Sequence, residues 1–333
     1  FVMGHVMEDY DALGGAVGMA KLALSLHKET YIVISGKSDT FEKIAEVLSR
    51  DDVNLNENDS RYLDITIGEE EALKYITPKS LLILVDHHRA MITASKKVLE
   101  SVPTKIIIDH HRRAEDLISD TVLLYLEPSS SSTSELVTEL VGYFDDRLDI
   151  TPGEATVMYA GIVLDTKHFA VQTGARTFEA AALLRRSGAN TDMVRMLFKD
   201  DMESLQLRAR LLADAKLPAA GIAISVYKNA KKEVRSSILA AQTADTLITI
   251  NGVYVGIAIV EYTDGSVGVS ARSDGSVNVQ VIMEELGGGG HQTVAGVQID
   301  NMRAADIEPQ IVALAKKQLE ERENNESDTV TGY

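Results

Sequence analysis

The sequence contains no cysteine, so neither disulfide bonds nor thiolate metal ligands are available to it. It has no apolar run near the roughly 20 residues that cross a bilayer, and no signal-peptide pattern. Basic residues are scarce too, since 33 Lys and Arg against 50 Asp and Glu give a formal net charge of -17. This balance argues against a broad grip on long nucleic acid, but not against a small anionic substrate, because bound cations can reverse the local potential.

The first half of the sequence alternates strand-like and helix-like stretches. The predicted strands are continuous apolar runs at 31–35, 81–85, 105–108 and 122–126, and helical stretches such as 13–27 and 41–49 lie between them. Continuous apolar strands separated by helices are typical of a parallel sheet covered on both faces. The pattern therefore predicts an α/β fold with a doubly wound, mainly parallel sheet.

The rest of the chain predicts a second, smaller α/β domain. Its 333 residues, 45% of them apolar, are enough for two domains of ordinary size. We expect a first domain over 1–190, a helical linker over 191–218, the smaller domain over 219–321 and a disordered polar tail over 322–333. The first residues, 1–4, read like the end of a strand already under way, so we expect the sequence to be an excised fragment.

Ionisable side chains follow three predicted strands where those strands end. His5, Asp9 and Asp11 follow the strand at 1–4, and Asp86 follows the strand at 81–85. The strand at 105–108 leads into Asp109, His110 and His111, and Asp165 ends a helical apolar stretch. Because the crevice of an open α/β sheet lies beyond the carboxyl ends of its strands, we expect these groups to meet there.

So many carboxylates in one crevice would repel each other unless divalent cations were bound between them. Oxygen and imidazole ligands without sulfur suit Mn²⁺ first, with Mg²⁺, Fe²⁺ or Zn²⁺ also possible. Five or six such ligands are enough for a pair of cations roughly 3.5–4 Å apart, an arrangement that recurs in the hydrolysis of phosphate esters. The plainer alternative is that an Asp after a strand only caps the next helix, and for Asp11 alone that alternative is favoured. The convergence of three strand ends favours the metal site.

A run of four glycines at 287–290, followed by His291, comes after a predicted helix. Glycines let a backbone come close to a ligand and turn its N–H groups toward phosphate. The alternative is a flexible connection between a helix and a strand. His291 and the upstream Arg272 favour the ligand, because Arg is well suited to phosphate recognition.

These motifs resemble a known family. His5-x-x-x-Asp9-x-Asp11-x-x-Gly14 with Asp109-His110-His111 resembles the signature of the DHH phosphoesterase superfamily, and 287–291 resembles its DHH-associated C-terminal domain. The order and spacing match up to about residue 320. Segments that resemble the catalytic region of the cyclic di-AMP phosphodiesterases of the GdpP type lie at 108–113, 125–128, 131–140, 176–180 and 270–273. One departure from that branch is His87 and Ala90, where the branch has a threonine and a proline.

The resemblance implies a role for each site residue. One Mn²⁺ would be held by His5, Asp9 and Asp86, and a second by Asp11, Asp86, His110 and Asp165. His111 and Arg112 would face the substrate phosphate, and Asp109 would orient a ligand histidine. The residues that would hold the nucleotide from the second domain are Arg272, Ser273, Gly288, Gly289, Gly290 and His291.

The function that the resemblance implies is hydrolysis of cyclic di-AMP to linear 5′-pApA by a water that two metals activate. Alternatives are an oligoribonuclease or mononucleotide phosphatase of the same superfamily, which would act on short linear substrates, and a nucleotide-binding sensor module that has lost catalysis. The resemblance further implies a cytoplasmic domain, anchored in the bacterial cell membrane through a region upstream of Phe1. A homodimer is possible.

Overall fold

The computed structural model describes residues 1–36, 38–49, 59–114, 116–144, 148–199, 201–231, 234–290 and 292–330. The chain divides into two compact units, Phe1–Lys199 and Asp200–Tyr333. Within the described residues, no helix combines the length and the apolar character that crossing a membrane requires.

The first unit is built on a six-stranded sheet in the order β3-β2-β1-β4-β5-β6, in which every pairing is parallel. Its strands are β1 (Val2–Met3), β2 (Ile32–Val33), β3 (Thr66–Ile67), β4 (Leu81–Val85), β5 (Thr104–Asp109) and β6 (Thr121–Leu126). From β1 the chain adds strands toward one edge and then, from β4, toward the other. The strand order therefore reverses between β1 and β4, which is where open α/β sheets bind their ligands.

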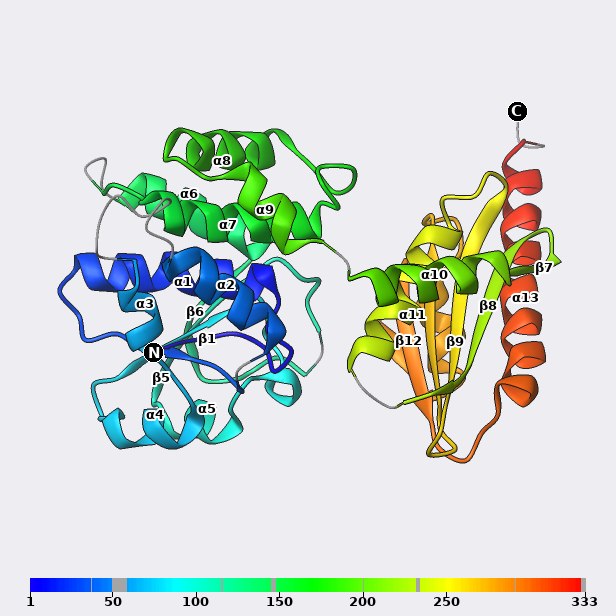
Figure 1. The fold of residues 1–333 in the computed structure, drawn as a ribbon, viewed down its shortest axis with the longest axis horizontal. Helices are drawn as coiled ribbons and strands as arrows, with labels where there is room; N and C mark the ends of the chain where they lie inside the picture. Colours follow the sequence, from blue (N-terminus) through cyan, green and yellow to red (C-terminus); the bar gives the residue numbers. More distant parts are fainter. Residues whose placement is uncertain are drawn as a thin grey trace. The chain divides into compact units, whose positions relative to one another are not determined.

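Helices cover both faces of this sheet (Figure 1). One core cluster joins Leu13, Leu136 and Val157 of three different helices to one face, and another joins Leu84 and Val98 to the opposite face. The doubly wound parallel sheet predicted from the sequence is confirmed. The helices of this unit are α1 (Tyr10–Ser25), α2 (Asp39–Ser49), α3 (Arg61–Asp64), α4 (Glu69–Tyr75), η1 (Ala90–Ile92), α5 (Lys96–Ser101), α6 (Thr133–Phe144), α7 (Pro152–Asp165), α8 (Ala175–Arg186) and α9 (Thr191–Leu197).

The second unit contains a mixed six-stranded sheet in the order β11-β12-β10-β9-β8-β7, in which only β8 and β9 pair in parallel. Alternate residues of β9 face opposite layers: Ile257 and Ile259 pack in the cluster that contains Ile307, whereas Ala258 packs with Ala244. The elements are β7 (Lys216–Ala219), β8 (Gly221–Ala230), β9 (Val253–Tyr262), β10 (Val267–Ser273), β11 (Gly289–Gly290), β12 (Val294–Ile299), α10 (Met202–Ala213), α11 (Val234–Leu247), α12 (Val279–Glu284) and α13 (Ala304–Val330).

The residues of the predicted linker over 191–218 are divided between the two units. α9 contributes Met193 and Val194 to the core of the first unit, while β7 pairs with β8 and the Ser225 hydroxyl donates to the carbonyl of Leu211 in α10. The predicted linker is therefore shared between the two units. α13 extends to Val330, and the disordered tail over 322–333 stays a prediction. Residues 331–333 lie outside the described residues.

Candidate metal centre

The loop after β1 brings the first two predicted ligands together. Asp9 caps α1, with one carboxylate oxygen accepting hydrogen bonds from the backbone N–H groups of Asp11 at 2.9 Å and Ala12 at 3.0 Å. Its other oxygen lies 3.7 Å from Nε2 of His5. The helix cap that the sequence offered as the plainer role for Asp11 thus belongs to Asp9, and Asp9 still has an oxygen for a second partner.

Asp11 lies in the first turn of α1 and is completely buried. Its carboxylate accepts hydrogen bonds from two backbone N–H groups at the start of α6, those of Thr133 at 2.7 Å and Ser134 at 2.8 Å. The unpaired amides of a helix N-terminus favour negative charge, so α6 holds this carboxylate in place.

Asp86 follows β4 and lies between the other groups. Its backbone is in the left-handed region, with φ of 63°, a conformation that Asp tolerates better than most residues. One carboxylate oxygen lies 3.3 Å from His5 Nε2, and the other lies 3.5 Å from His110 Nε2 and 3.7 Å from His111 Nδ1. The Thr133 hydroxyl also donates to it at 3.1 Å. Asp86 is therefore placed to contact two separate cations.

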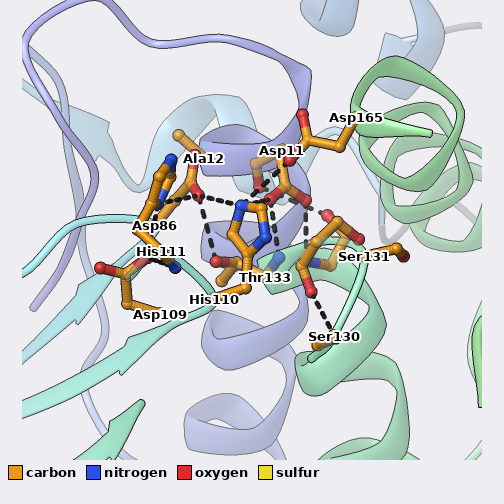
Figure 2. A network of polar contacts seen from close by, with 12 residues as sticks. Asp11, Ala12, Asp86, Asp109, His110, His111, Ser130, Ser131, Thr133 and Asp165 are labelled. Carbon is orange, nitrogen blue, oxygen red and sulfur yellow. Dashed lines mark hydrogen bonds and ion pairs between the residues drawn. The ribbon is translucent and has the colours of Figure 1, made fainter. Parts of the chain in front are cut away.

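His110, directly after β5, lies close to Asp11, Asp86 and Asp165 (Figure 2). Its Nε2 lies 3.0 Å from Asp165 at the end of α7 and 3.8 Å from Asp11. α7 reaches the site because residue 161 is a glycine, at which a Cβ would lie 2.2 Å from the Ser134 hydroxyl and 2.8 Å from an Asp11 oxygen. The close approach of α7 to α1 and α6 thus depends on Gly161.

The residues predicted as metal ligands from the sequence form one cluster. Side-chain atoms within 4.8 Å of one another form three overlapping groups. The groups are His5 with Asp9 and Asp86, Asp11 with His110 and Asp165, and Asp86 with His110 and His111.

The buried carboxylates repel one another. Burial raises the pKa of Asp11 well above its usual range, and the charges of Asp86 and Asp165 add to this effect. Burial also raises the pKa of Asp165 to about 6, against the opposing influence of His110. Burial alone would raise the pKa of Asp86 as well, but His110 and His5 hold it below its usual range.

Two imidazoles of the cluster, His5 and His110, respond strongly to these carboxylates. Burial alone would lower the pKa of His5, but Asp86 and Asp9 outweigh burial and raise it to about 11. In the same way Asp165 and Asp86 raise the pKa of His110 well above its usual range, against burial. Protons on the imidazoles thus balance the carboxylate charge when no metal is bound. Divalent cations could take the place of those protons.

The donor set fits divalent cations. Nε2 of His110 is buried, and none of the described residues meets hydrogen-bond geometry with it, although carboxylates surround it. A buried ring nitrogen of this kind is costly unless it binds something. Nitrogen and oxygen donors without sulfur match Mn²⁺, Mg²⁺, Fe²⁺ or Zn²⁺.

Asp109 has partners other than the expected one. We expected it to orient a ligand histidine, but its carboxylate contacts Nδ1 of His111 at 2.7 Å and Nδ1 of His88, and neither belongs to the predicted ligand set. At the end of β5, His110 thus lies against Asp86, whereas Asp109 contacts His88 and His111. His111 is partly exposed beside the cluster, and Arg112 is exposed.

In the second unit, Arg272 is tied down within its own sheet and helix. Its Nε donates to the carboxylate of Asp245 in α11 at 3.1 Å, and its Nη1 donates to the carbonyl oxygen of Ala271. Ser273 corrects a prediction, because its buried hydroxyl donates to the carbonyl of Val277 at 2.6 Å and accepts from the N–H of Gly275. The Ser273 side chain orders a turn and does not present its hydroxyl to a substrate.

The glycine run pairs with β12 and is not simply a flexible connection. A Cβ at Gly288 would lie 2.4 Å from the carbonyl oxygen of Gly296, and one at Gly290, where φ is 149°, would lie 2.4 Å from Cα of Ala295. Backbone packing therefore explains these two glycines. At Gly289 a Cβ would meet no described atom within 4 Å, so this glycine leaves room for a ligand. His291 lies outside the described residues.

Sequence reasoning missed the groups that hold the ligands in place. Thr133 and Ser134 were read only as part of a helix start, and Gly161 only as part of a helix. The signal for Thr133 was present, since a serine- and threonine-rich run at 129–134 precedes α6. Nothing local to Gly161 marks it as the point where α7 meets α1.

The fold and the cluster together define a class: an α/β protein of two units with a candidate metal site at the switch point of its first sheet. Residues 1–162 match the family described as DHH family, N-terminal domain, and residues 220–321 match the DHHA1 domain. The chain therefore belongs to the DHH family, as its motifs predicted.

Curated relatives cover most of the chain. It is 43% identical over 314 residues to the cyclic-di-AMP phosphodiesterase GdpP of Geobacillus thermodenitrificans and 38% identical over 317 residues to the cyclic-di-AMP phosphodiesterase PdeA of Listeria monocytogenes. These matches span 93% and 94% of this chain but 46% of each relative, so the chain corresponds to about half the length of these relatives.

More distant relatives match this chain over nearly their whole lengths. The bifunctional oligoribonuclease and PAP phosphatase NrnA of Mycoplasma genitalium is 23% identical, with 91% of this chain and 89% of that protein covered. Among solved structures, an exopolyphosphatase-related protein from Bacteroides fragilis has a TM-score of 0.74 at 22% identity, with 96% of this chain and 91% of that one covered. This structural likeness concerns the fold.

Proposed function

We propose that this chain is a metal-dependent phosphodiesterase that hydrolyses cyclic di-AMP to linear 5′-pApA. The observation that supports this most is the position of Asp86, whose two oxygens face His5 on one side and His110 on the other. A carboxylate that lies between two sets of metal ligands can contact both of two cations, and a pair of cations recurs in the hydrolysis of phosphodiesters. The curated relatives at 43% and 38% identity, both named cyclic-di-AMP phosphodiesterases, supply the substrate.

In this proposal His5, Asp9 and Asp86 hold one cation, and Asp86 also contacts a second. The residues that hold the second cation with it are Asp11, His110 and Asp165. Mn²⁺ is the proposed metal, since the donors are oxygen and imidazole nitrogen. When bound, the two cations would supply Lewis-acid polarisation of the attacking water and of the phosphate oxygens.

The protein's own groups have separate tasks. The carboxylates and imidazoles would hold the cations in place, and the reaction needs the attacking water in line with the departing 3′ oxygen. His111, next to the cluster, and Arg112 donate to the non-bridging phosphate oxygens, where negative charge grows in the transition state. Arg272 and the backbone at Gly289 bind the nucleotide from the second unit, and His291 is proposed to join them.

A hydrolysis assay over a panel of substrates tests the proposal. The purified chain with Mn²⁺ is given cyclic di-AMP, linear pApA and 3′-phosphoadenosine 5′-phosphate, and products are separated by chromatography. We expect conversion of cyclic di-AMP to pApA that stops when a chelator removes the metal. Absence of Mn²⁺-dependent cleavage, with cyclic di-AMP still bound tightly, would instead support a sensor module that has lost catalysis.

The second candidate is hydrolysis of short linear nucleotides. The alignment with NrnA covers 91% of this chain and 89% of that protein, so the two match over nearly their whole lengths. This match favours the second candidate. Its metal ligands would be the same, so the metal centre does not separate the two candidates. Faster turnover of pApA or of 3′-phosphoadenosine 5′-phosphate than of cyclic di-AMP would support it.

The setting of the chain in the cell stays a prediction. A cytoplasmic location, anchoring in the cell membrane through additional segments and a homodimer all rest on the family resemblance. The lengths of the relatives are compatible with additional segments, since this chain spans 46% of GdpP and of PdeA.

A further inference from the structure

His88 lies at the centre of a buried network beside the metal cluster. The carboxylate of Asp109 is completely buried and has three donors. They are Nδ1 of His88, the backbone N–H of His111 at 3.1 Å and Nδ1 of His111 at 2.7 Å. One carboxylate thus joins two imidazoles that follow different strands, β4 and β5.

The second ring nitrogen of His88 is also occupied. Its Nε2 accepts a hydrogen bond from the backbone N–H of Ala114 at 3.0 Å. An amide can only donate, so Nε2 carries no proton and the ring proton lies on Nδ1, where it is donated to Asp109. The hydrogen-bond network therefore fixes both the tautomer and the orientation of a side chain that is only 3% exposed.

The same segment holds the loop that carries His111 and Arg112. The backbone N–H of Ile118 donates to the carbonyl of His88 at 2.8 Å, and Arg89 forms an ion pair with Asp116 at 2.7 Å. The chain between β5 and β6 is thus fastened to the segment after β4 at Ala114, Asp116 and Ile118.

We propose that His88 is a positioning residue that acts through Asp109 to fix the ring of His111 toward the substrate phosphate. The inference rests on the proposed function, in which His111 faces that phosphate. The buried Asp109 carboxylate accepts from Nδ1 of both rings, so it couples the orientation of His111 to that of His88. Because Asp109 holds Nδ1 of His111, we assign Nε2 of His111 to the phosphate.

His88 makes no contact with a predicted metal ligand, since its ring contacts are Asp109 and Ala114. It is also absent from every group of potential metal ligands among the described residues. A change at His88 should therefore alter His111 and leave the metal ions in place.

Two matched substitutions separate its two contacts. His88→Asn keeps a donor near the position of Nδ1 and removes the acceptor for Ala114. His88→Gln keeps a polar atom near the position of Nε2 and removes the donor to Asp109. We expect His88→Gln to lower kcat on the order of 10- to 100-fold, as losses of outer-shell partners do, with KM and Mn²⁺ affinity within about twofold of the parent. His88→Asn should keep kcat within about threefold.

A ring signal of His111 tests the same inference without turnover. In ¹⁵N NMR spectra of the full chain, the parent and His88→Asn should show one His111 tautomer with its proton on Nδ1, and His88→Gln should show a shifted or exchange-averaged pattern. An unchanged His111 signal and unchanged kcat in His88→Gln would overturn the proposal. So would a parallel loss of folding and Mn²⁺ binding in both variants, which would make His88 merely structural. A parent enzyme inactive on every phosphodiester would refute the proposed function, while the NMR comparison would still decide the role of His88.

Discussion

At the scale of single residues, the site is a set of charges that are stable only in combination. Asp11 and Asp109 are completely buried, and each accepts several hydrogen bonds, whereas Asp86 faces imidazoles on both sides. Burying such charges is costly unless they are paired or bind a metal. Asp86 is the residue that both ligand groups share, so the account depends on it most.

Asp86→Asn should remove metal binding and turnover together. Asn keeps the shape of the side chain and tolerates the left-handed backbone at this position, so the fold should persist. We expect kcat to fall by at least on the order of 100-fold, the upper range for outer-shell losses, since a direct ligand is lost. Turnover and Mn²⁺ stoichiometry measure the effect. Asp192→Asn, at an exposed carboxylate of α9, is the matched control and should change neither by more than about twofold.

Mn²⁺ binding should release protons. The raised pKa of His5, about 11, means that this ring is protonated at neutral pH when no metal is bound. Its pairing with Asp86 and Asp9 stabilises the metal-free fold below the unfolded pKa of 6.5, and that stability is lost as the pH rises through about 11. Because a metal needs the neutral ring, Mn²⁺ affinity should rise with pH.

Calorimetric titration in buffers of different ionisation enthalpy measures the released protons directly. We expect on the order of one to two protons per chain near pH 7, since His110 carries a raised pKa as well. Mn²⁺ binding with no proton release and no pH dependence would contradict the charge balance described for the cluster.

Much of the residue-level site could be predicted from the sequence. His5, Asp86 and His110 could be placed together because parallel strands end at one edge of a sheet. The partners of Asp109 could not be predicted, because neighbouring residues at a strand end point in different directions and their side-chain rotamers depend on the loop that covers them. The internal hydrogen bonds of the Ser273 hydroxyl were hidden for the same reason.

At the scale of elements, two helices bring the site together at the switch point. The N-terminus of α6 supplies the amides that hold Asp11, and the last residue of α7 supplies Asp165. α1 packs between them, and Gly161 allows α7 to approach. The site is therefore a product of helix packing as much as of strand ends.

Gly161→Ala should disturb this packing. The added Cβ would lie 2.9 Å from Cα of Asp11 as well as close to the Ser134 hydroxyl, and backbone cannot give way cheaply. We expect destabilisation of about 1–3 kcal/mol, typical of overpacking, together with weaker Mn²⁺ binding. Urea unfolding and titration measure both effects.

Gly142→Ala is the matched control for Gly161→Ala. Its Cβ would meet only the end of the flexible Leu183 side chain, at 3.1 Å, and alanine gains up to about 1 kcal/mol in helix propensity. Stability should be unchanged or slightly higher. Equal effects of the two substitutions would contradict the role given to Gly161.

The long elements could be predicted from the sequence, whereas several of the short ones could not. The predicted strand at 81–85 has the bounds of β4, and the predicted helix at 41–49 ends where α2 ends. β3 has only two residues, and α3 has four, so neither shows a period that distinguishes strand from helix. β7 includes Pro218, which suits an edge strand but also ends helices, so this strand was overlooked.

At the scale of the whole molecule, the two units have separate cores, and all proposed metal ligands belong to the first. A ligand that binds only the folded state stabilises it by about 2.7 kcal/mol at 100 times its Kd. Mn²⁺ should therefore raise the melting temperature of the first unit only. Scanning calorimetry of the full chain, with Mn²⁺ or with a chelator, should show one transition that shifts and one that does not. Equal shifts of both transitions would count against metal binding confined to the first unit.

The most direct test of the central claim is the anomalous scattering of manganese in crystals of the chain grown with Mn²⁺. The account predicts two peaks roughly 3.5–4 Å apart, with Asp86 contacting both, His5 on one and His110 on the other. A single peak, peaks remote from Asp86, or no bound manganese at saturating concentration would contradict it.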